Sequence, residues 1–90
     1  MGQMRLTQTR QFKKDIKRLQ KRGKDLAKIK AVINLLLEET PLPPKNRDHQ
    51  LGGNWNGHRD CHIEPDWILI YKILKDELRL ERTGTHSDLF

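Results

Sequence analysis

The stretch EPDWILIYKILKDELRLERT, residues 64–83, contains the pattern that decides the fold. Apolar residues occupy both faces of the segment 67–71, which is typical of a strand in the middle of a sheet. Turn-forming residues at 64–66 and 75–77 bound this segment, and an alternating strand pattern follows over 78–83. The stretch therefore predicts a β-hairpin whose first arm, residues 67–74, is the central strand.

Two amphipathic helices are expected before this hairpin. Phe12, Ile16 and Leu19 recur at helical spacing on a charged background, and a second apolar stripe runs over 26–37. Gly23 separates the two stripes, so the helices form a hairpin.

The remaining segments complete an α+β pattern. Residues 5–9 predict a short strand, the Pro-rich segment 40–44 predicts a rigid linker, and 45–55 predicts a loop with at most a short strand near His49. We therefore expect a single domain over residues 1–90, with the N-terminal helix hairpin packed on one face of a small antiparallel β-sheet.

The charge of the chain is strongly uneven. Eighteen Lys and Arg against twelve Asp and Glu give a net charge of +6. Residues 1–39 carry +7 and residues 40–90 carry −1. Such a field attracts polyanions, most often nucleic acid, although an acidic protein partner or solubility alone explains it too. Lys13, Lys17 and Lys21 are the candidate RNA-docking residues.

The sequence also indicates a cytoplasmic location. Its longest apolar run, 67–71, is far shorter than the roughly 20 residues of a membrane helix, and the N-terminus has no signal-peptide pattern. Cys61 is the single cysteine, so no internal disulfide can form, as is usual in a reducing compartment. We expect Cys61 to be a small strand residue rather than a nucleophile.

Four histidines in a short chain first suggest a metal site. His58 and His62 would lie on one face of a helix, but the surrounding pattern is that of a strand. Four strand residues place them roughly 13 Å apart, too far to bind one ion. We therefore expect neither a metal nor another cofactor.

Hairpin geometry predicts a different grouping. In an antiparallel hairpin, paired residue numbers have a nearly constant sum, about 151 to 153 for a turn at 75–77. If the pairing continues past Gly84, His86 then lies opposite Pro65, Asp66 or Trp67. The turn at 64–66 brings the chain back beside His62. One end of the sheet thus collects these residues with Trp67. We expect Arg82, on the same strand face as His86, to reach back towards them.

Imidazoles beside a carboxylate and a guanidinium suit RNA cleavage by the ribose 2′-hydroxyl. That reaction needs a base for the hydroxyl proton, an acid for the leaving 5′ oxygen and a cation for the phosphoryl charge. Histidine can be either acid or base near neutral pH. Trp67 and Phe90 are candidate surfaces for base stacking, although Trp67 is equally well explained as a core residue.

Four strings, in this order and spacing, resemble the YafQ branch of the RelE/ParE toxin superfamily. They are KNRDHQL at 45–51, WNGHRDCHIEPDW at 55–67, ILIYK at 68–72 and LERTGTH at 80–86. The resemblance covers nearly the whole chain and implies a RelE-like fold. It also implies a type II toxin that cleaves messenger RNA on the translating ribosome without metal and is silenced by a cognate antitoxin.

The resemblance further implies which residues form the site. The matching positions are His49, His62, Asp66, Trp67, Arg82, His86 and Phe90. His86 would be the general acid and Arg82 would stabilise the transition state. Asp66, His49 or His62 would act as the base or orient the reacting groups, and the residues leave this choice open. The basic helices would dock on ribosomal RNA.

Two other functions remain as alternatives. One is a noncatalytic ParE-like toxin that binds gyrase, and the other is a basic nucleic-acid-binding module. Neither has a use for His62, Asp66 and His86 at one end of a sheet, and this grouping favours the ribonuclease.

Overall fold

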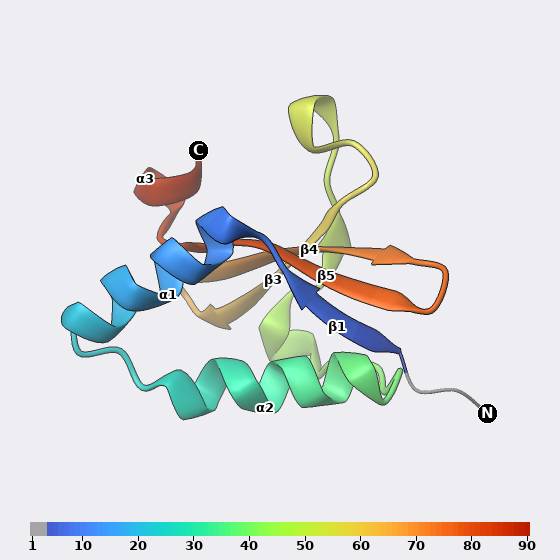
Figure 1. Ribbon diagram of the computed structural model, residues 1–90, viewed down its shortest axis with the longest axis horizontal. Coiled ribbons are helices and arrows are strands. Elements are labelled where there is room, and N and C mark those ends of the chain that lie inside the picture. Colours follow the sequence, from blue (N-terminus) through green and yellow to red (C-terminus); the bar gives the residue numbers. More distant parts are fainter. Residues whose placement is uncertain (1–3) are drawn as a thin grey trace.

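The computed structural model describes residues 4–90, which are built around a five-stranded sheet (Figure 1). The strands lie in the order β1-β5-β4-β3-β2, so β4 is central, as predicted. Their bounds are β1 Arg5–Gln8, β2 His49–Gln50, β3 Arg59–Glu64, β4 Trp67–Leu74 and β5 Glu77–Gly84. The sequence analysis expected no signal peptide at the N-terminus. That expectation concerns in part residues 1–3, which lie outside the described residues.

The sheet is mixed, whereas the sequence predicted an antiparallel one. The pairs from β2 to β5 are antiparallel, but β1 is parallel to β5. A parallel partner requires a long crossover, and here almost the whole chain lies between the two strands. Hairpin arithmetic treats only strands that are neighbours in sequence, so it could not place β1.

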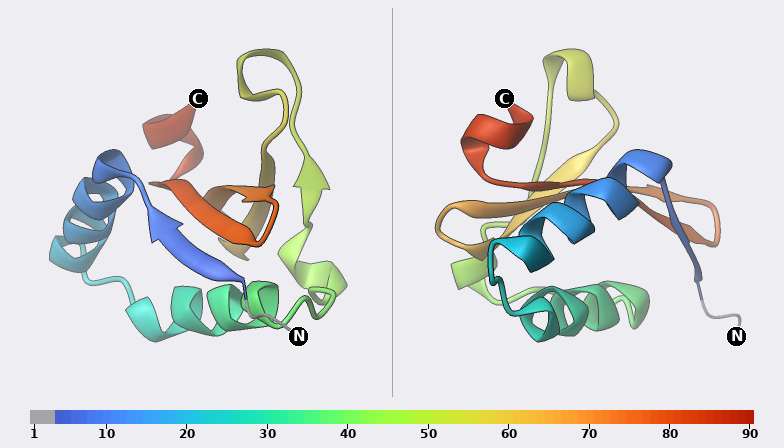
Figure 2. Two further views of the ribbon diagram at one scale, coloured as in Figure 1. Left: turned by 45° about the vertical axis from the view of Figure 1, so that its right-hand side comes forward. Right: turned by 60° about the vertical axis from the view of Figure 1, so that its left-hand side comes forward.

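The helix hairpin lies on one face, which confirms the predicted α+β architecture. Helices α1 (Arg10–Lys21) and α2 (Leu26–Leu37) contact β5 and β3, respectively. Each begins at a side-chain cap, Thr9 on the Phe12 amide and Asp25 on the Ala27 amide. The views of Figure 2 show α2 below the sheet and the short C-terminal helix α3 (His86–Leu89) above it. None of these helices is long and apolar enough to cross a membrane.

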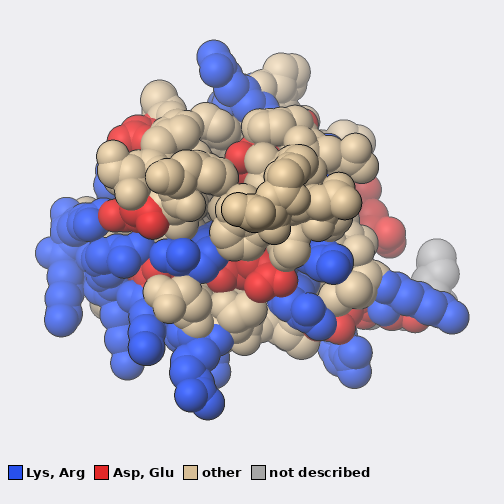
Figure 3. Space-filling view, turned by 90° about the horizontal axis from the view of Figure 1, so that it is seen from above, with Lys and Arg blue, Asp and Glu red and all other residues tan. Residues whose placement is uncertain are grey.

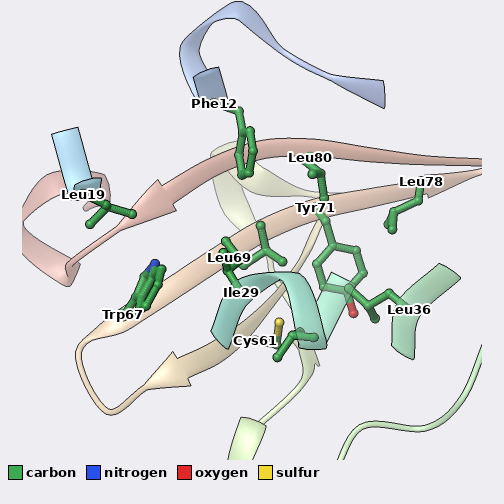
Figure 4. Close-up of a cluster of buried hydrophobic side chains, with 11 residues drawn as sticks. Phe12, Leu19, Ile29, Leu36, Cys61, Trp67, Leu69, Tyr71, Leu78 and Leu80 are labelled. Carbon is green, nitrogen blue, oxygen red and sulfur yellow. The ribbon is translucent and has the colours of Figure 1, made fainter. Parts of the chain in front are cut away.

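The core lies between the helix hairpin and the lower face of the sheet (Figure 4). Its buried apolar side chains include Phe12, Leu19, Ile29, Leu36, Cys61, Trp67, Leu69, Tyr71, Leu78 and Leu80. Burial raises the pKa of the Cys61 thiol, so this cysteine stays a protonated strand residue. The apolar stripes found in the sequence are thus the surfaces that form the core.

A β-bulge in β5 changes which residues face the core. Tyr71 pairs with Leu80, but its neighbour Ile70 pairs with Arg82, which leaves Glu81 as the extra residue. Strand neighbours alternate between faces, so the bulge puts Thr83 on the core side with Leu80. Arg82 consequently points to the opposite face, where the candidate site lies.

Candidate active site

The upper face of the sheet carries a row of residues that crosses four strands. Arg82, Ile70, Asp60 and His49 are successive register partners on β5, β4, β3 and β2. Adjacent strands lie about 4.8 Å apart, so this row spans roughly 14 Å from Arg82 to His49. The buried Ile70 forms a floor between the charged groups.

A second row contains the groups that the sequence predicted to converge. His62 pairs with Ile68 on β4, and His86 enters above this row from α3. The ring centroids of His62 and His86 are 5.6 Å apart. His86 Nδ1 lies 2.6 Å from Asp66 Oδ1. The structure thus brings His62, Asp66 and His86 together from three separate segments.

Asp66 fixes the orientation of His86. Its Oδ1 also accepts the backbone N–H of His86 at 3.0 Å. Hydrogen bonds from that N–H and from the imidazole hold the pKa of Asp66 below its ordinary value, so the carboxylate is ionised at neutral pH. A carboxylate only accepts, so His86 Nδ1 carries a hydrogen and Nε2 remains for a substrate.

His62 and His49 present the same ring nitrogen. His62 Nδ1 lies 3.2 Å from the Pro65 carbonyl oxygen, and His49 Nδ1 lies 2.8 Å from that of Arg47. A carbonyl oxygen cannot donate, so both Nδ1 atoms carry the hydrogen. In the neutral ring, Nε2 then has a free lone pair and can accept a proton.

Asp60 is a site residue that the sequence analysis missed. Its Oδ1 lies 3.1 Å from His49 Nδ1, but the Nδ1 hydrogen is directed at the Arg47 carbonyl and Oδ1 receives no hydrogen bond from residues 4–90. Burial raises the pKa of Asp60, and the positive charges of His49, His62 and His86 oppose that effect. Strand alternation was the available signal, because Asp60 and His62 are two residues apart on β3.

The segment that leads to His49 is attached to the sheet by hydrogen bonds from Asn46 and to Asp48. Asp48 accepts hydrogen bonds from the Tyr71 hydroxyl and from Arg59, the latter at 3.2 and 3.3 Å. The buried Asn46 donates to the His62 carbonyl at 2.7 Å. His49 therefore lies on a short strand whose position is set by its neighbours, although its own side chain is exposed.

Arg82 is bound differently from the expectation. The sequence predicted that it would reach towards His86, but its guanidinium is held by Asp15 of α1. Arg82 Nε donates to Asp15 Oδ2 at 2.7 Å, and Nη2 donates to Oδ1 at 3.2 Å. The hydrogen bond to Asp15 raises the pKa of Arg82. The sequence could not show this pairing, because α1 and β5 meet only in the folded chain.

Helix α3 was also missed, although the sequence carries a signal for it. Thr85 and Asp88 form a capping box, in which each side chain accepts the other's backbone N–H. Arg22, the C-cap residue of α1, donates to Asp88 Oδ2 at 2.7 Å. A Cβ on Gly84 would lie 2.8 Å from Asp88 Oδ2, so glycine permits this close approach. Asp88 thereby attaches the helix that carries His86 to α1.

Asp88→Asn is expected to lower stability by about 1 kcal/mol at neutral pH. The hydrogen bond from Arg22, followed by that from the Thr85 amide, holds the pKa of Asp88 well below its ordinary value. A lowered folded pKa stabilises the protein above the unfolded pKa, near 3.9, and this gain disappears as the pH falls through the folded value. Urea titrations should show the difference between variant and wild type above about pH 5 and its decline below about pH 4. A difference that does not change with pH would contradict the role of the charge.

The two aromatic candidates differ in exposure. Phe90 is 61% exposed, and its ring centroid lies 6.5 Å from that of His86, so it has a free face beside the site. Trp67 is fully buried on the core face, where its Nε1 donates to Thr83 Oγ1 at 2.9 Å. The position of Trp67 therefore does not agree with the predicted stacking on a base. Alternation along β4 puts it on the core face with Leu69 and Tyr71.

Basic residues lie on two sides of the site. The exposed Lys13, Lys17 and Lys21 are spaced by four residues and form one stripe on α1. Figure 3 shows Lys and Arg concentrated on the left and lower left of the molecule, the side on which α1 lies in Figure 1. A separate hollow is lined by Lys45, Arg47, His62 and Pro65.

The remaining histidine does not belong to the cluster. His58 Nε2 lies 3.0 Å from Glu81 Oε2, so His58 is paired with the bulge residue. Within residues 4–90, no three His, Cys, Asp or Glu side chains are grouped as the ligands of one metal ion would be.

Helices on one face of the sheet and acid–base residues on the other define the RelE-like class of small toxins that the sequence resembled. A family model for YafQ, a bacterial toxin of type II toxin–antitoxin systems, matches residues 4–90, and the chain belongs to this family.

Curated and solved relatives support this membership. The mRNA interferase toxin YafQ of Escherichia coli K12 is 56% identical over 81 residues, which cover 89% of this chain and 88% of the relative. The crystal structure of the E. coli DinJ–YafQ toxin–antitoxin complex matches with a TM-score of 0.91 and 50% identity, covering 98% of both chains. A metal-bound toxin from Helicobacter pylori matches with a TM-score of 0.91 and 42% identity, covering 97% of this chain and 99% of that one.

Proposed function

We propose that this chain is an mRNA endoribonuclease toxin that acts on the translating ribosome and so inhibits translation. The observation that carries the proposal is the His86–Asp66 pair, with its ring 5.6 Å from His62. Two imidazoles at this spacing can act on opposite sides of one phosphate. The relatives named mRNA interferase support the same activity.

The proposed reaction is attack of a ribose 2′-oxygen on the adjacent phosphorus. The 2′-oxygen–phosphorus bond forms and the bond to the 5′ oxygen breaks, leaving a cyclic phosphate and a 5′-hydroxyl. His86 gives a proton from Nε2 to the leaving 5′ oxygen. The Arg82 guanidinium stabilises the negative charge that gathers on the phosphoryl oxygens.

His62 is the proposed base for the 2′-hydroxyl proton. Its Nδ1 contact with Pro65 leaves Nε2 able to accept, and its ring lies near that of His86. Asp66 then orients His86 through the two hydrogen bonds that its Oδ1 accepts, and its lowered pKa makes the carboxylate a weak base. His49 lies further along the first row and is the alternative base.

The chain also offers groups that can hold the message. The hollow beside His62 has Lys45 and Arg47 on its walls, which suit the phosphate of a neighbouring nucleotide. The exposed ring of Phe90 can stack on a base beside His86. Trp67 is not proposed for this role.

Metal independence is part of the proposal, because side chains alone can supply acid, base and charge stabilisation. The metal-bound relative from H. pylori makes a direct test worthwhile. Cleavage should continue in the presence of a chelator that removes zinc and copper but spares magnesium. Loss of cleavage, restored by one added metal, would disprove this part of the proposal.

We further propose an inhibitory antitoxin as the partner of this chain in the bacterial cytoplasm. The complex of the E. coli relative with DinJ supports this partner. The antitoxin and the ribosome would compete for a chain whose N-terminal half is strongly basic.

The decisive experiment is a reconstituted translation reaction with a defined message. We expect the purified chain to cut the message within the translated region and to leave the same message uncut when initiation is blocked. Equal cutting of both would contradict ribosome dependence. No cutting, combined with inhibition of gyrase, would replace the proposal with the noncatalytic ParE-like function.

Reversal of charge at Lys13, Lys17 and Lys21 is expected to weaken binding to ribosomes by tenfold or more at low salt. The slope of log affinity against log salt should also flatten, since fewer phosphates are neutralised. Sedimentation with ribosomes at several salt concentrations measures both. The single variants Lys17→Glu and Lys75→Glu form a matched pair, because Lys75 is at the exposed β4–β5 turn and away from the stripe. Only Lys17→Glu should weaken binding. Unchanged binding of the triple variant would reassign the stripe to antitoxin contact or solubility.

A further inference from the structure

We infer that Asp15 is a positioning residue that sets the orientation of the Arg82 guanidinium for phosphate. This inference rests on the proposed function and adds a residue to that site. Asp15 lies in the middle of α1, far in sequence from every other group of the site. Its side chain is nevertheless completely buried, and it is in direct contact with Arg82.

Both carboxylate oxygens of Asp15 are occupied. Oδ2 accepts Arg82 Nε at 2.7 Å and the backbone N–H of Thr83 at 3.1 Å. Oδ1 accepts Nη2 of Arg82 at 3.2 Å and Nη2 of Arg18 at 2.9 Å. Gln11 makes a longer contact with Oδ1, at 3.4 Å. A buried carboxylate needs such a complete set of donors.

The geometry fixes Arg82 more tightly than an ordinary ion pair would. Nε and Nη2 lie on one edge of the planar guanidinium, so two parallel hydrogen bonds set the plane as well as the position. The Thr83 amide holds the same carboxylate to β5, one residue from Arg82. The side chain of Arg82 is thereby fixed at its base and at its tip relative to one strand.

One nitrogen of Arg82 remains for substrate. Within residues 4–90, Nη1 is not among the Arg82 atoms that hydrogen-bond to Asp15, and the side chain is 23% exposed. Asp15 thus occupies one edge of the guanidinium and leaves Nη1 for a phosphoryl oxygen. An arginine fixed in advance loses less conformational entropy when the transition state forms.

A purely structural ion pair would predict the same contacts but different kinetics. If Asp15 only stabilised the fold, its substitution would lower activity whether or not Arg82 were present. If it positions Arg82, its effect on cleavage must vanish once Arg82 is removed. A double-mutant cycle separates the two cases.

The test measures single-turnover cleavage on programmed ribosomes for wild type, Asp15→Asn, Arg82→Ala and the double variant. We expect Asp15→Asn to slow cleavage by about tenfold to a hundredfold with little change in ribosome affinity, and to add no further loss in the Arg82→Ala background. An equal fold-loss in both backgrounds would overturn the inference. Asp25→Asn, which replaces one good helix cap with another, is the matched control.

Two further measurements keep the inference testable on its own. Asp15→Glu keeps the charge but displaces the guanidinium, so it should also slow cleavage by about tenfold or more. Wild-type cleavage by Asp15→Glu would overturn the inference even if Asp15→Asn fails to fold. In NMR spectra, the Arg82 Nε–H should exchange slowly in the wild type. Rapid exchange would contradict the geometry, whereas absence of cleavage by the wild type would reject only the proposed function.

Discussion

Replacing His86 with alanine is expected to slow cleavage on the ribosome by about 10²- to 10⁴-fold, the range typical of a lost general acid. His86 has Nδ1 on Asp66 and Nε2 available beside His62. Within residues 4–90, the Nδ1 atoms of His62 and His49 are instead hydrogen-bonded to backbone carbonyls. Its side chain is 55% exposed, so the fold should tolerate the change. The variant should unfold within a few degrees of the wild type.

The measurement is a single-turnover time course together with a thermal melt. Ser87→Ala, in the same short helix, is the matched control and should cleave at the wild-type rate. If His86→Ala also cleaves at the wild-type rate, the acid lies elsewhere and His62 becomes the candidate. If the variant melts far below the wild type, His86 is structural instead.

The central hairpin could be predicted from sequence because its information is local. Residues 67–74 are the only long apolar strand pattern, and the turn at 75–77 sets the pairing of both arms. The strand pairing ends at Ile68 and Gly84, so His86 reaches Asp66 from α3 and not as a strand partner. The tight turns therefore indicated the end of the sheet where the cluster lies, but not the helix that carries His86.

The features that were missed depend on contacts between distant segments. In the sequence, Asp15 is an ordinary charged residue of a helix, and only the docking of α1 against β5 buries it. Asp60 is likewise an ordinary polar residue of a strand, and its burial could not be predicted. The parallel pairing of β1 arises from the path of the whole chain. Strand alternation puts Asp60 on the face of His62, but the burial of Asp15 and Asp60 and the pairing of β1 depend on tertiary packing.

Trp67 shows a third kind of limit, since two explanations fitted the sequence equally well. It directly follows the turn that carries Asp66, so a position beside the substrate was reasonable. The choice depends on the face of β4 to which it points, and the structure places it on the core face with Leu69 and Tyr71 (Figure 4). This placement changes the expected result of a substitution.

Trp67→Ala is expected to lower the free energy of unfolding by about 3–5 kcal/mol, because it leaves a large cavity in a small core. It also removes the donor to Thr83 Oγ1. Thr83 pairs with Leu69 on β4, and its backbone N–H donates to Asp15. The cavity left by Trp67 would therefore weaken the packing around Thr83, the residue next to Arg82. Much of the protein should be unfolded at 37 °C, since domains of this size have only about 5–15 kcal/mol of stability.

Trp67→Phe separates the two explanations. It keeps an aromatic ring in the core and loses the Nε1–H, so we expect a cost of about 1–2 kcal/mol and wild-type cleavage at a temperature where the protein is folded. Urea titration and the dependence of the cleavage rate on message concentration measure the two effects. If Trp67 stacked on a base, Trp67→Ala would instead keep its stability and raise the KM for the message. That result would show that β4 exposes this ring to RNA, which its complete burial against Leu19 and the sheet does not permit.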